Sequence, residues 1–480
     1  MYRLSRARFQ DGDRAPLASG LLLLCTLAIA SAVFAQFYPG AMSPDSLAIL
    51  RQARSGVLQD GHPPLLALIW AFADRVVPGP APVLLLNLVL YYGGLFLIFR
   101  AASRGARATA IVCCSAVGLF PPLLGIIGAI WIDVTLAGFL LSALGILMTA
   151  GTRPAGSPRI LLNIGAMLLL AGAVAVRHNG AAAAWPIALF LFLGLLPQCR
   201  WRAVRLVLPG IAAALFVGLS FAAAQWLSAQ VTDVKQHLWR VAAVYDIAGV
   251  SHLERRFLFD PRLFDGASLD DIDKLYSPRS AAPLLLGRQV HPLPPAVEQV
   301  EATPFDPREF DSTRNAMLQE NWRRVLLAHP VSFLAHRLDV FESLATRTAW
   351  GLWAPVFGAI YENDLGIMPR GEPDGRFFEY LRVLAFDGYL FVPAGYLTVA
   401  ILAIVPTLVL GLRRQSVRLL SASALYASGI AHMAGLFFVA ASADFRYSHW
   451  TIAATTVATA LVVLELMAGW RGERGKGERD

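Results

Sequence analysis

Residues 43–70 read SPDSLAILRQARSGVLQDGHPPLLALIW and follow directly on the first long apolar run of the chain. Ser43 is a favourable N-cap, Pro44 suits the first helical position, and Gly56 is a plausible end, so the sequence predicts a short helix here. A second, apolar helix is predicted after His62-Pro63-Pro64. If the chain spans a membrane, the interpretation of its other polar residues depends on the side on which residues 43–70 lie.

The composition is that of a membrane protein. Of the 480 residues, 56% are hydrophobic and 15% are charged, and soluble domains are less apolar and more highly charged. A membrane-spanning helix needs about 20 predominantly apolar residues, and several such runs are separated by short links that carry arginine. The sequence therefore predicts an all-α polytopic membrane protein.

The formal net charge of +8 does not indicate a nucleic-acid partner, because the basic excess lies in the tails and short loops. Residues 225–389 contain 22 of the 33 acidic residues and only 17 basic ones. Basic residues in short loops are typical of orientation signals on the cytoplasmic side of a membrane.

Ten spans are predicted, with both termini in the cytoplasm. They lie at about 17–37, 81–99, 108–126, 129–149, 159–176, 180–197, 204–225, 389–411, 417–440 and 449–468. Every second link and the C-terminal tail carry an arginine cluster, and this pattern places them on the inner side. The clusters begin at Arg100, Arg153, Arg200, Arg413 and Arg471.

This orientation divides the chain into five segments and places residues 43–70 outside. They are a cytoplasmic tail (1–16), a transmembrane core (17–225) with a first outer loop (38–80), an outer-side domain (226–388), C-terminal transmembrane helices (389–468) and a second cytoplasmic tail (469–480). Arginine greatly outnumbers lysine and alanine is abundant, a composition associated with GC-rich bacteria. The expected location is thus a bacterial inner membrane.

Two apolar stretches are expected to lie on the outer surface rather than to cross. Pro64–Val77 is short for a crossing and contains Asp74 and Arg75. Within 329–359 several charged side chains oppose insertion, and apolar residues recur at helical spacing, which predicts an amphipathic helix packed on the outer surface. Those apolar residues are Leu334, Leu338, Phe341 and Leu344.

The notable polar residues all fall at the outer ends of the predicted spans. They are Asp45, Asp60 and His62 in the first outer loop, Asp133 at the start of the fourth span, Arg177, His178 and Asn179 after the fifth, and Asp444, Arg446, Tyr447 and His449 before the last. No Asp, Glu, Lys or Arg lies near the middle of a predicted span. This shared side indicates a functional site at the outer boundary of the membrane.

Each of these residues also has a purely structural interpretation. Asp45 could complement a helix dipole, at about 0.3–1 kcal/mol, and Asp60 before glycine is an ordinary turn signal. Arg177 and Arg446 could be interfacial anchors, although their planar donor groups also suit a phosphate. An acid as close to an apolar span as Asp133 is costly unless it is paired or functional.

The order of these motifs resembles the GT-C glycosyltransferases, and within them the bacterial lipid A aminoarabinose, lipopolysaccharide galacturonosyl and protein O-mannosyl transferases. The resemblance covers roughly 17–225 and 389–468. It rests on an acid near the start of the first outer loop, His62-Pro63-Pro64-Leu65, Trp131-Ile132-Asp133-Val134, Arg177-His178-Asn179 and Asp444-Phe445-Arg446-Tyr447.

The resemblance implies a transferase that takes a sugar from a polyprenyl-phosphate donor at the outer face and gives it to an envelope lipid, glycan or protein. Asp45 would activate the acceptor or bind a divalent cation, magnesium or manganese. His62 would shape the site, and Arg177 or Arg446 would bind the donor phosphate, with His178, Asn179 and Tyr447 beside them. The family often has two adjacent acids, whereas Ser46 follows Asp45 here. Either Asp60 or Asp133 would then supply a second carboxylate, or the reaction would not depend on a metal.

Three other functions compete. A transporter or lipid flippase usually places ionisable residues at mid-membrane and often shows inverted repeats, and neither is evident here. A glycan ligase or polymerase would place its essential residues in 226–388, for example Arg323 or His336, and would make Asp45 expendable. In a non-catalytic scaffold no single polar substitution would abolish function.

Overall fold

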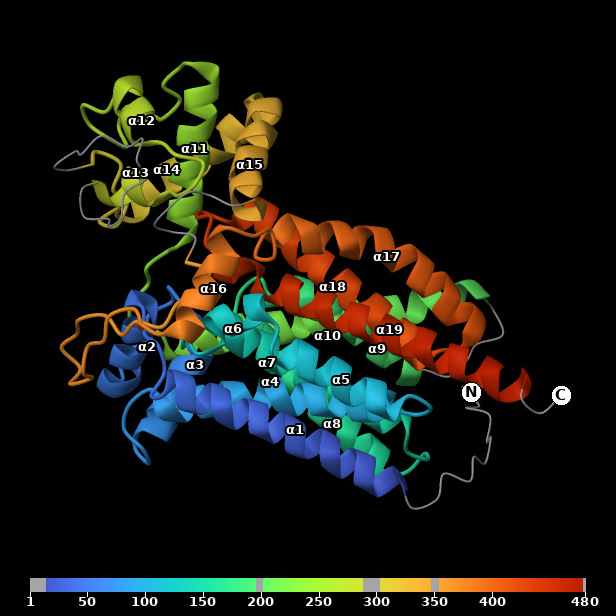
Figure 1. The fold of residues 1–480 in the computed structure, drawn as a ribbon. Coiled ribbons are helices and arrows are strands. Elements are labelled where there is room, and N and C mark those ends of the chain that lie inside the picture. Colours follow the sequence, from blue (N-terminus) through green and yellow to red (C-terminus); the bar gives the residue numbers. More distant parts are fainter. Residues whose placement is uncertain (1–13, 196–201, 288–302, 347–353, 478–480) are drawn as a thin grey trace.

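The computed structural model describes residues 14–195, 202–287, 303–346 and 354–477, and in these ranges every regular element is a helix (Figure 1). Eight of these helices are long and apolar enough to cross a bilayer. They are α1 (Arg14–Phe37), α4 (Ala81–Ala102), α7 (Ile132–Gly151), α8 (Ser157–Val176), α10 (Arg202–Val231), α17 (Pro393–Arg414), α18 (Val417–Val439) and α19 (His449–Gly477). The chain is therefore a polytopic all-α membrane protein, as predicted.

The predicted count of ten spans is too high for the helices that meet these criteria. The stretch predicted at 108–126 is divided into α5 (Arg107–Gly118) and α6 (Pro121–Ile127), bent by 51° at the break, and counts as at most one broken span. Two consecutive prolines explain the break, because they lack the N–H that would continue the helix. The helix α9 (Gly180–Leu195) is apolar but shorter, and positions 196–197 of that predicted span lie outside the described residues.

The long helices form a bundle with two distinct ends (Figure 1). The start of α1 and the end of α19 lie at one end of the bundle. The opposite end carries α2 (Pro44–Ser55), α3 (Leu65–Asp74) and α16 (Arg376–Phe386). We call this second end the outer end, following the orientation predicted from the arginine clusters.

The two short helices of the first outer loop form as predicted. Ser43 is the N-cap of α2, Pro44 its first residue, and Gly56 ends it in the left-handed conformation, with φ of 74°. Such a C-terminal position favours glycine because a Cβ is disfavoured there. At ten residues α3 is too short to cross a bilayer and ends at Asp74.

A separate domain stands on the outer end of the bundle (Figure 1). It comprises α11 (Trp239–Glu254), α12 (Leu269–Leu275), α13 (Ala282–Leu286), α14 (Ser312–Ala328) and α15 (Pro330–Ala345). These helices share an apolar core of their own, which includes Tyr245, Phe305 and Leu318. By contrast, α16 packs Phe378 and Leu381 into the core of the membrane bundle.

The helix expected within 329–359 is present as α15, and the face that it turns toward the outer domain carries polar as well as apolar side chains. Leu344 is buried, whereas Leu334 and Leu338 are exposed, and the polar pair His336 and Arg337 is buried in their place. The physical reason is a buried acid on α11, which draws the imidazole and guanidinium inward. That helix therefore faces the domain with polar side chains and leaves apolar ones outside.

Candidate functional site

Backbone pairing fixes the start of the first outer loop. The amide of Ala41 donates to the carbonyl of Gly128 at 2.9 Å, and the amide of Ile130 donates back to Ala41 at 2.9 Å. On the other side, the amide of Met42 donates to the carbonyl of Ala359 at 2.8 Å. This short three-segment pairing places the first turn of α2 beside the residues that lead into α7.

Side chains then lock α2 against the entry to α7. Trp131 donates from its indole nitrogen to the Ser43 hydroxyl at 2.9 Å, and the Ser46 hydroxyl donates to the carbonyl of Ile130 at 2.8 Å. Trp131 also stacks on Phe357, with ring centroids 4.8 Å apart. These contacts of Ser43 and Ser46 thus fix the position of the Asp45 carboxylate in the first turn of α2.

Asp45 and Arg446 form the first ion pair of the site. A guanidinium nitrogen of Arg446 lies 2.6 Å from the Asp45 carboxylate, and its Nε lies 2.6 Å from the carboxylate of Asp444. Asp444 is also the N-cap of the short 3-10 helix η2 (Phe445–Ser448). The Asp45 side chain is 38% exposed and Arg446 only 14%, so Asp45 is the member of this group that a solute can reach.

Asp133 and Arg177 form the second ion pair, almost buried, with 3% of the Asp133 side chain and 11% of the Arg177 side chain exposed. Arg177 follows the last residue of α8 and donates from Nε to the Asn179 side-chain oxygen at 2.7 Å. One carboxylate oxygen of Asp133 is buried without a hydrogen-bond partner among the described residues. Asn179 therefore orients the arginine, and Asp133 retains an acceptor position that a further group could use.

The ring of Tyr447 lies beside both arginines. The guanidinium carbons of Arg177 and Arg446 are 4.9 Å and 5.4 Å from the ring centroid, and Arg446 also lies 5.0 Å from the ring of Trp131. Cation–π attraction of this kind is stronger where water is excluded. The aromatic rings thus hold two positive charges close to the same place. We call Asp45, Asp133, Arg177, Asp444, Arg446 and Tyr447 the outer-face cluster.

The remaining predicted site residues lie at the edge of this cluster. The His62 ring nitrogen is 3.9 Å from the Asp45 carboxylate, and His178 is exposed. The carboxylate of Asp60 accepts a hydrogen bond from the Gln236 amide at 2.5 Å. Asp60 therefore ties the first outer loop to the start of the outer domain, and that bond directs it away from the outer-face cluster.

The electrostatics of the cluster set the protonation states. Dense surroundings disfavour charge on Asp45, but the neighbouring Arg446, with smaller contributions from His62 and Arg177, holds the pKa of Asp45 below its usual 3.8. Burial lowers the pKa of His62 below 6.5, and the attraction of Asp45 offsets this only in part. At neutral pH Asp45 is a carboxylate and His62 a neutral imidazole.

Asp444 behaves differently from Asp45. Burial raises the pKa of Asp444 to about 6, although the positive charge of Arg446 opposes the rise. The carboxylates of Asp45 and Asp133 add to the rise, because like charges disfavour one another. The sequence placed Asp444 in the last outer loop but gave no reason to choose it, since its burial depends on distant segments.

The acids of the cluster do not form a recognisable metal site. Asp45 and Asp133, the two predicted ligands, each face an arginine. In the part of the chain that the structure describes, no group of three or more His, Cys, Asp or Glu side chains could hold a metal ion. The divalent-cation hypothesis therefore gains no ligand set from this geometry and stays a prediction.

Two further buried polar side chains lie near the cluster, His449, which the sequence indicated, and Tyr91, which it did not. His449 is fully buried, and both of its ring nitrogens lack a hydrogen-bond partner among the described residues. Its ring centroid lies 5.9 Å from that of Tyr91, whose hydroxyl is likewise unpaired within the described chain. Nothing in the sequence singles out Tyr91, because a tyrosine within an apolar helix is most often an ordinary core residue.

The outer domain holds the segment that carries Asp444 and Arg446. The amide of Ala281 donates to the carbonyl of Ala441, and the amide of Ala443 donates to the carbonyl of Arg279, each at 2.8 Å. From α15, the guanidinium of Arg337 donates to the carbonyl of Ala440 at 2.8 Å. Three hydrogen bonds thus tie the outer domain to the segment that positions Arg446.

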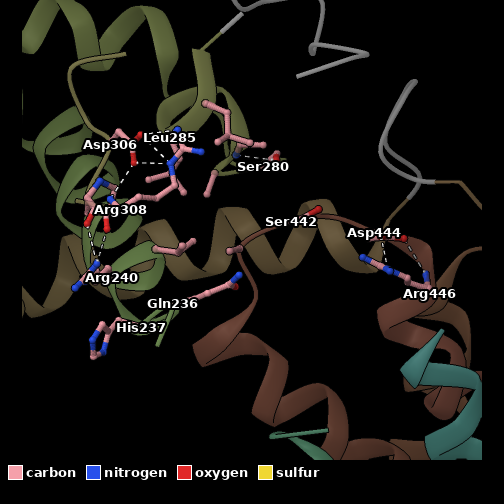
Figure 2. Close-up of a pocket in the computed structure, with 16 residues that line it drawn as sticks. Gln236, His237, Arg240, Ser280, Leu285, Asp306, Arg308, Ser442, Asp444 and Arg446 are labelled. Carbon is pink, nitrogen blue, oxygen red and sulfur yellow. Dashed lines mark hydrogen bonds and ion pairs between the residues drawn. The ribbon is translucent and has the colours of Figure 1, made fainter. Parts of the chain in front are cut away.

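A cavity of about 350 Å³ lies between the outer domain and this segment. Figure 2 shows Asp444 and Arg446 on one side of it and Arg240 and Arg308 on the other. Arg240 is held by three backbone carbonyls, those of Pro307, Arg308 and Phe310, at 3.0–3.1 Å. The rest of the lining is largely apolar and includes Val241, Ala281, Leu285 and Leu286.

A second aspartate–arginine arrangement lies inside the outer domain. Asp246 lies 2.6 Å from Arg337 and 3.3 Å from His336 and accepts a hydrogen bond from the Trp322 indole at 2.9 Å. The other ring nitrogen of His336 lies 2.9 Å from the Tyr276 hydroxyl. We call Asp246, Tyr276, Trp322, His336 and Arg337 the buried cluster.

The two residues named for a ligase function lie in unsuitable places. His336 is fully buried in the buried cluster. Arg323 is exposed on α14 and bonds to Glu320 three residues earlier, at 2.9 Å. The first is inaccessible to a substrate, and the second lies on an open helix surface.

Comparison with known proteins yields no relative. No protein-family model, curated protein or solved structure matches the chain.

Proposed function

We propose that this protein is a membrane glycosyltransferase that moves a sugar from a polyprenyl-phosphate donor to an envelope lipid, glycan or protein at the outer face of a bacterial inner membrane. One observation carries the proposal: an accessible carboxylate, Asp45, lies against Arg446, while Arg177 shares the Tyr447 ring with it. These residues come from α2, the end of α8 and η2. A base beside two arginines suits a reaction in which a hydroxyl attacks and a phosphate leaves.

The proposed step is a displacement at the anomeric carbon of the sugar. The acceptor oxygen or nitrogen forms the new bond to that carbon, and its proton passes to the Asp45 carboxylate. The bond between the anomeric carbon and the phosphate oxygen breaks, and its electron pair stays on the departing polyprenyl phosphate. Arg177 and Arg446 stabilise this negative charge with planar, permanently charged donors.

Protonation of Asp444 lets the cluster accept one phosphate. Arg177 and Arg446 contribute two positive charges, and Asp45, Asp133 and Asp444 contribute three negative charges when all are ionised. Because its pKa is about 6, Asp444 can take up a proton at modest cost when a phosphodiester adds a further negative charge nearby. Arg446 then turns from Asp444 to the donor phosphate.

The cavity beside Arg446 is suited to the acceptor. Its volume of about 350 Å³ lies in the range of small-molecule sites, roughly 300–1,000 Å³. Most of its lining comes from the outer domain, so an acceptor would approach from that side while the prenyl chain of the donor stays in lipid. Selection of the acceptor would fall to the lining residues of α11 and α13.

Substitution of Asp45 by asparagine tests the proposal. A positioned general base contributes about 10²–10⁴-fold to a rate, so Asp45→Asn should abolish the envelope glycan and cause polyprenyl-phosphate sugar to accumulate. Protein level in the membrane is measured in parallel. Asp364→Asn is a matched control, because Asp364 pairs with Arg51 of α2 at 2.5 Å but lies outside the outer-face cluster.

Unchanged glycan in Asp45→Asn cells, when deletion of the whole protein removes it, would contradict the role of Asp45. Unchanged glycan after deletion of the protein would contradict the transferase itself.

A further inference from the structure

Four large apolar side chains lie exposed at the junction of α14 and α15. Leu327, near the end of α14, is 69% exposed, and Val331, Leu334 and Leu338 of α15 are 78%, 50% and 57% exposed. Val331, Leu334 and Leu338 recur at a spacing of three and four residues, which places them on one face of α15, and Leu327 lies just before the turn at His329. We call these four residues the α15 stripe. A contiguous exposed apolar surface of this kind marks an interaction site.

The opposite face of α15 already packs against the rest of the outer domain. The α15 stripe is therefore not needed to complete the core of that domain. Arg337 and His336 point into the buried cluster, and Val340 and Leu344 belong to the core of the outer domain. The inward face is thus chosen by a buried polar network. The outward apolar face needs another partner.

The position of α15 indicates what that partner is. The helix runs across the direction of α17 and α18 near their outer ends (Figure 1). Phe341, one turn from its end, contacts Phe437 of α18, with ring centroids 5.7 Å apart. Next to that contact, Phe438 and Val439 of α18 are themselves 57% and 56% exposed. The stripe therefore continues the apolar surface that the membrane spans present to lipid.

We propose that the α15 stripe inserts into the outer leaflet of the bilayer that surrounds α17 and α18. Amphipathic interfacial helices bury their apolar face about 5–10 Å into the boundary between headgroups and acyl chains. Arg323 and Arg324 precede Leu327 by about one turn and would lie among the headgroups, where cations favour anionic lipids. Glu342, one turn beyond Leu338, ends the stripe where the helix reaches the bundle.

This anchor gives the outer domain a second fixed point. The first is the segment at residues 440–446, which pairs with the backbone at Arg279 and Ala281 and binds Arg337. Contact with lipid along α15 would hold the domain at a set tilt over the cavity. The inference concerns the domain and the membrane alone and does not depend on the transferase proposal.

Single-cysteine labelling of the full chain in lipid nanodiscs tests the inference. The four native cysteines, Cys25, Cys113, Cys114 and Cys199, are replaced by alanine, and an environment-sensitive fluorophore is placed at Leu334→Cys and, separately, at Val331→Cys. Leu402→Cys of α17, 70% exposed, reports the lipid-facing surface, and Asp270→Cys of α12 reports the aqueous surface of the same domain.

We expect phosphatidylglycerol with brominated acyl chains to quench the labels at Leu334 and Val331 as strongly as the label at Leu402. Aqueous iodide should quench only the label at Asp270. Iodide quenching at Leu334 and Val331 equal to that at Asp270 would overturn the inference. Protection of both labels from iodide and from bromolipid would also overturn it, because a second copy or another protein would then cover the stripe.

Discussion

The outer-face cluster and the buried cluster are built from the same chemistry and differ in access. Each joins an aspartate to an arginine at 2.6 Å and adds histidine and aromatic neighbours. Asp246 and Arg337 have 0% and 1% of their side chains exposed, whereas Asp45 has 38%. The length of an ion pair therefore says little about its role, and the route by which a solute could reach it says more.

The two clusters also differ in how completely their polar groups are paired within the protein. In the buried cluster, Asp246 binds Arg337 and Trp322, and Arg337 also binds the carbonyl of Ala440. These bonds join α11, α14, α15 and the end of α18. In the outer-face cluster, Asp133 keeps an unpaired oxygen among the described residues, and Asp45 faces solvent. We infer that one cluster holds the outer domain in place and that the other is free to exchange partners with a ligand.

The largest difference between the two clusters is expected in thermal stability, for the variant Arg337→Met. Loss of the arginine leaves Asp246 charged and buried, and breaking such a pair costs about 3–5 kcal/mol. The midpoint of thermal unfolding of the detergent-purified protein should fall sharply. Arg446→Met should lower it much less, because Asp45 remains accessible to water and Asp444, with a pKa of about 6, can take up a proton.

The double variant Asp246→Leu/Arg337→Met sharpens this prediction. Replacement of a complete buried ion pair by apolar residues of similar size is often neutral or stabilising, so the double variant should recover most of the lost stability. If it is as unstable as Arg337→Met alone, the buried charge is not what makes that single substitution costly.

A smaller effect is expected for the pH dependence of lipid-phosphate binding. As pH rises through about 6, Asp444 ionises and competes with a phosphate for Arg446, so affinity should fall. Loss of one partly screened charge interaction of about 1 kcal/mol corresponds to roughly fivefold. Asp444→Asn keeps the capping oxygen and should remove the fall, as measured by titration of a polyprenyl phosphodiester, whose single negative charge is the same at pH 5 and pH 8. A fall of equal size in the variant would assign it to another group.

Most of the fold follows from local features of the sequence. Hydropathy locates the spans, and the Ser43, Pro44 and Gly56 signals give both ends of α2. The predicted count of ten spans was too high for two reasons. The helix breaks before Pro121, and α9 is shorter than a spanning helix. The lengths of the apolar runs and the positions of the prolines can be read from the sequence. Whether α5 and α6 form one straight helix or bend at the prolines depends on the segments that pack around them.

The site was less accessible to sequence reasoning than the fold. The shared side of Asp45, Asp133, Arg177 and Arg446 could be inferred from topology, but which acid meets which arginine could not. The polar inward face of α15 could not be predicted for a related reason. The burial of Arg337 depends on Asp246, an acid on a different helix, and helical spacing alone favours the apolar residues.

The most direct test of the outer-face cluster is lipid binding by the purified protein. Native mass spectrometry of the full chain with a long-chain polyprenyl phosphate is compared for the unmodified protein, Arg446→Gln and Arg51→Gln, the last removing an exposed ion pair with Asp364 on the same helix as Asp45. A charge-assisted hydrogen bond is worth about 1.5–3 kcal/mol, so Arg446→Gln should weaken the adduct about tenfold or more, while Arg51→Gln should retain it. Equal adducts in all three proteins would contradict the assignment of the phosphate to Arg446.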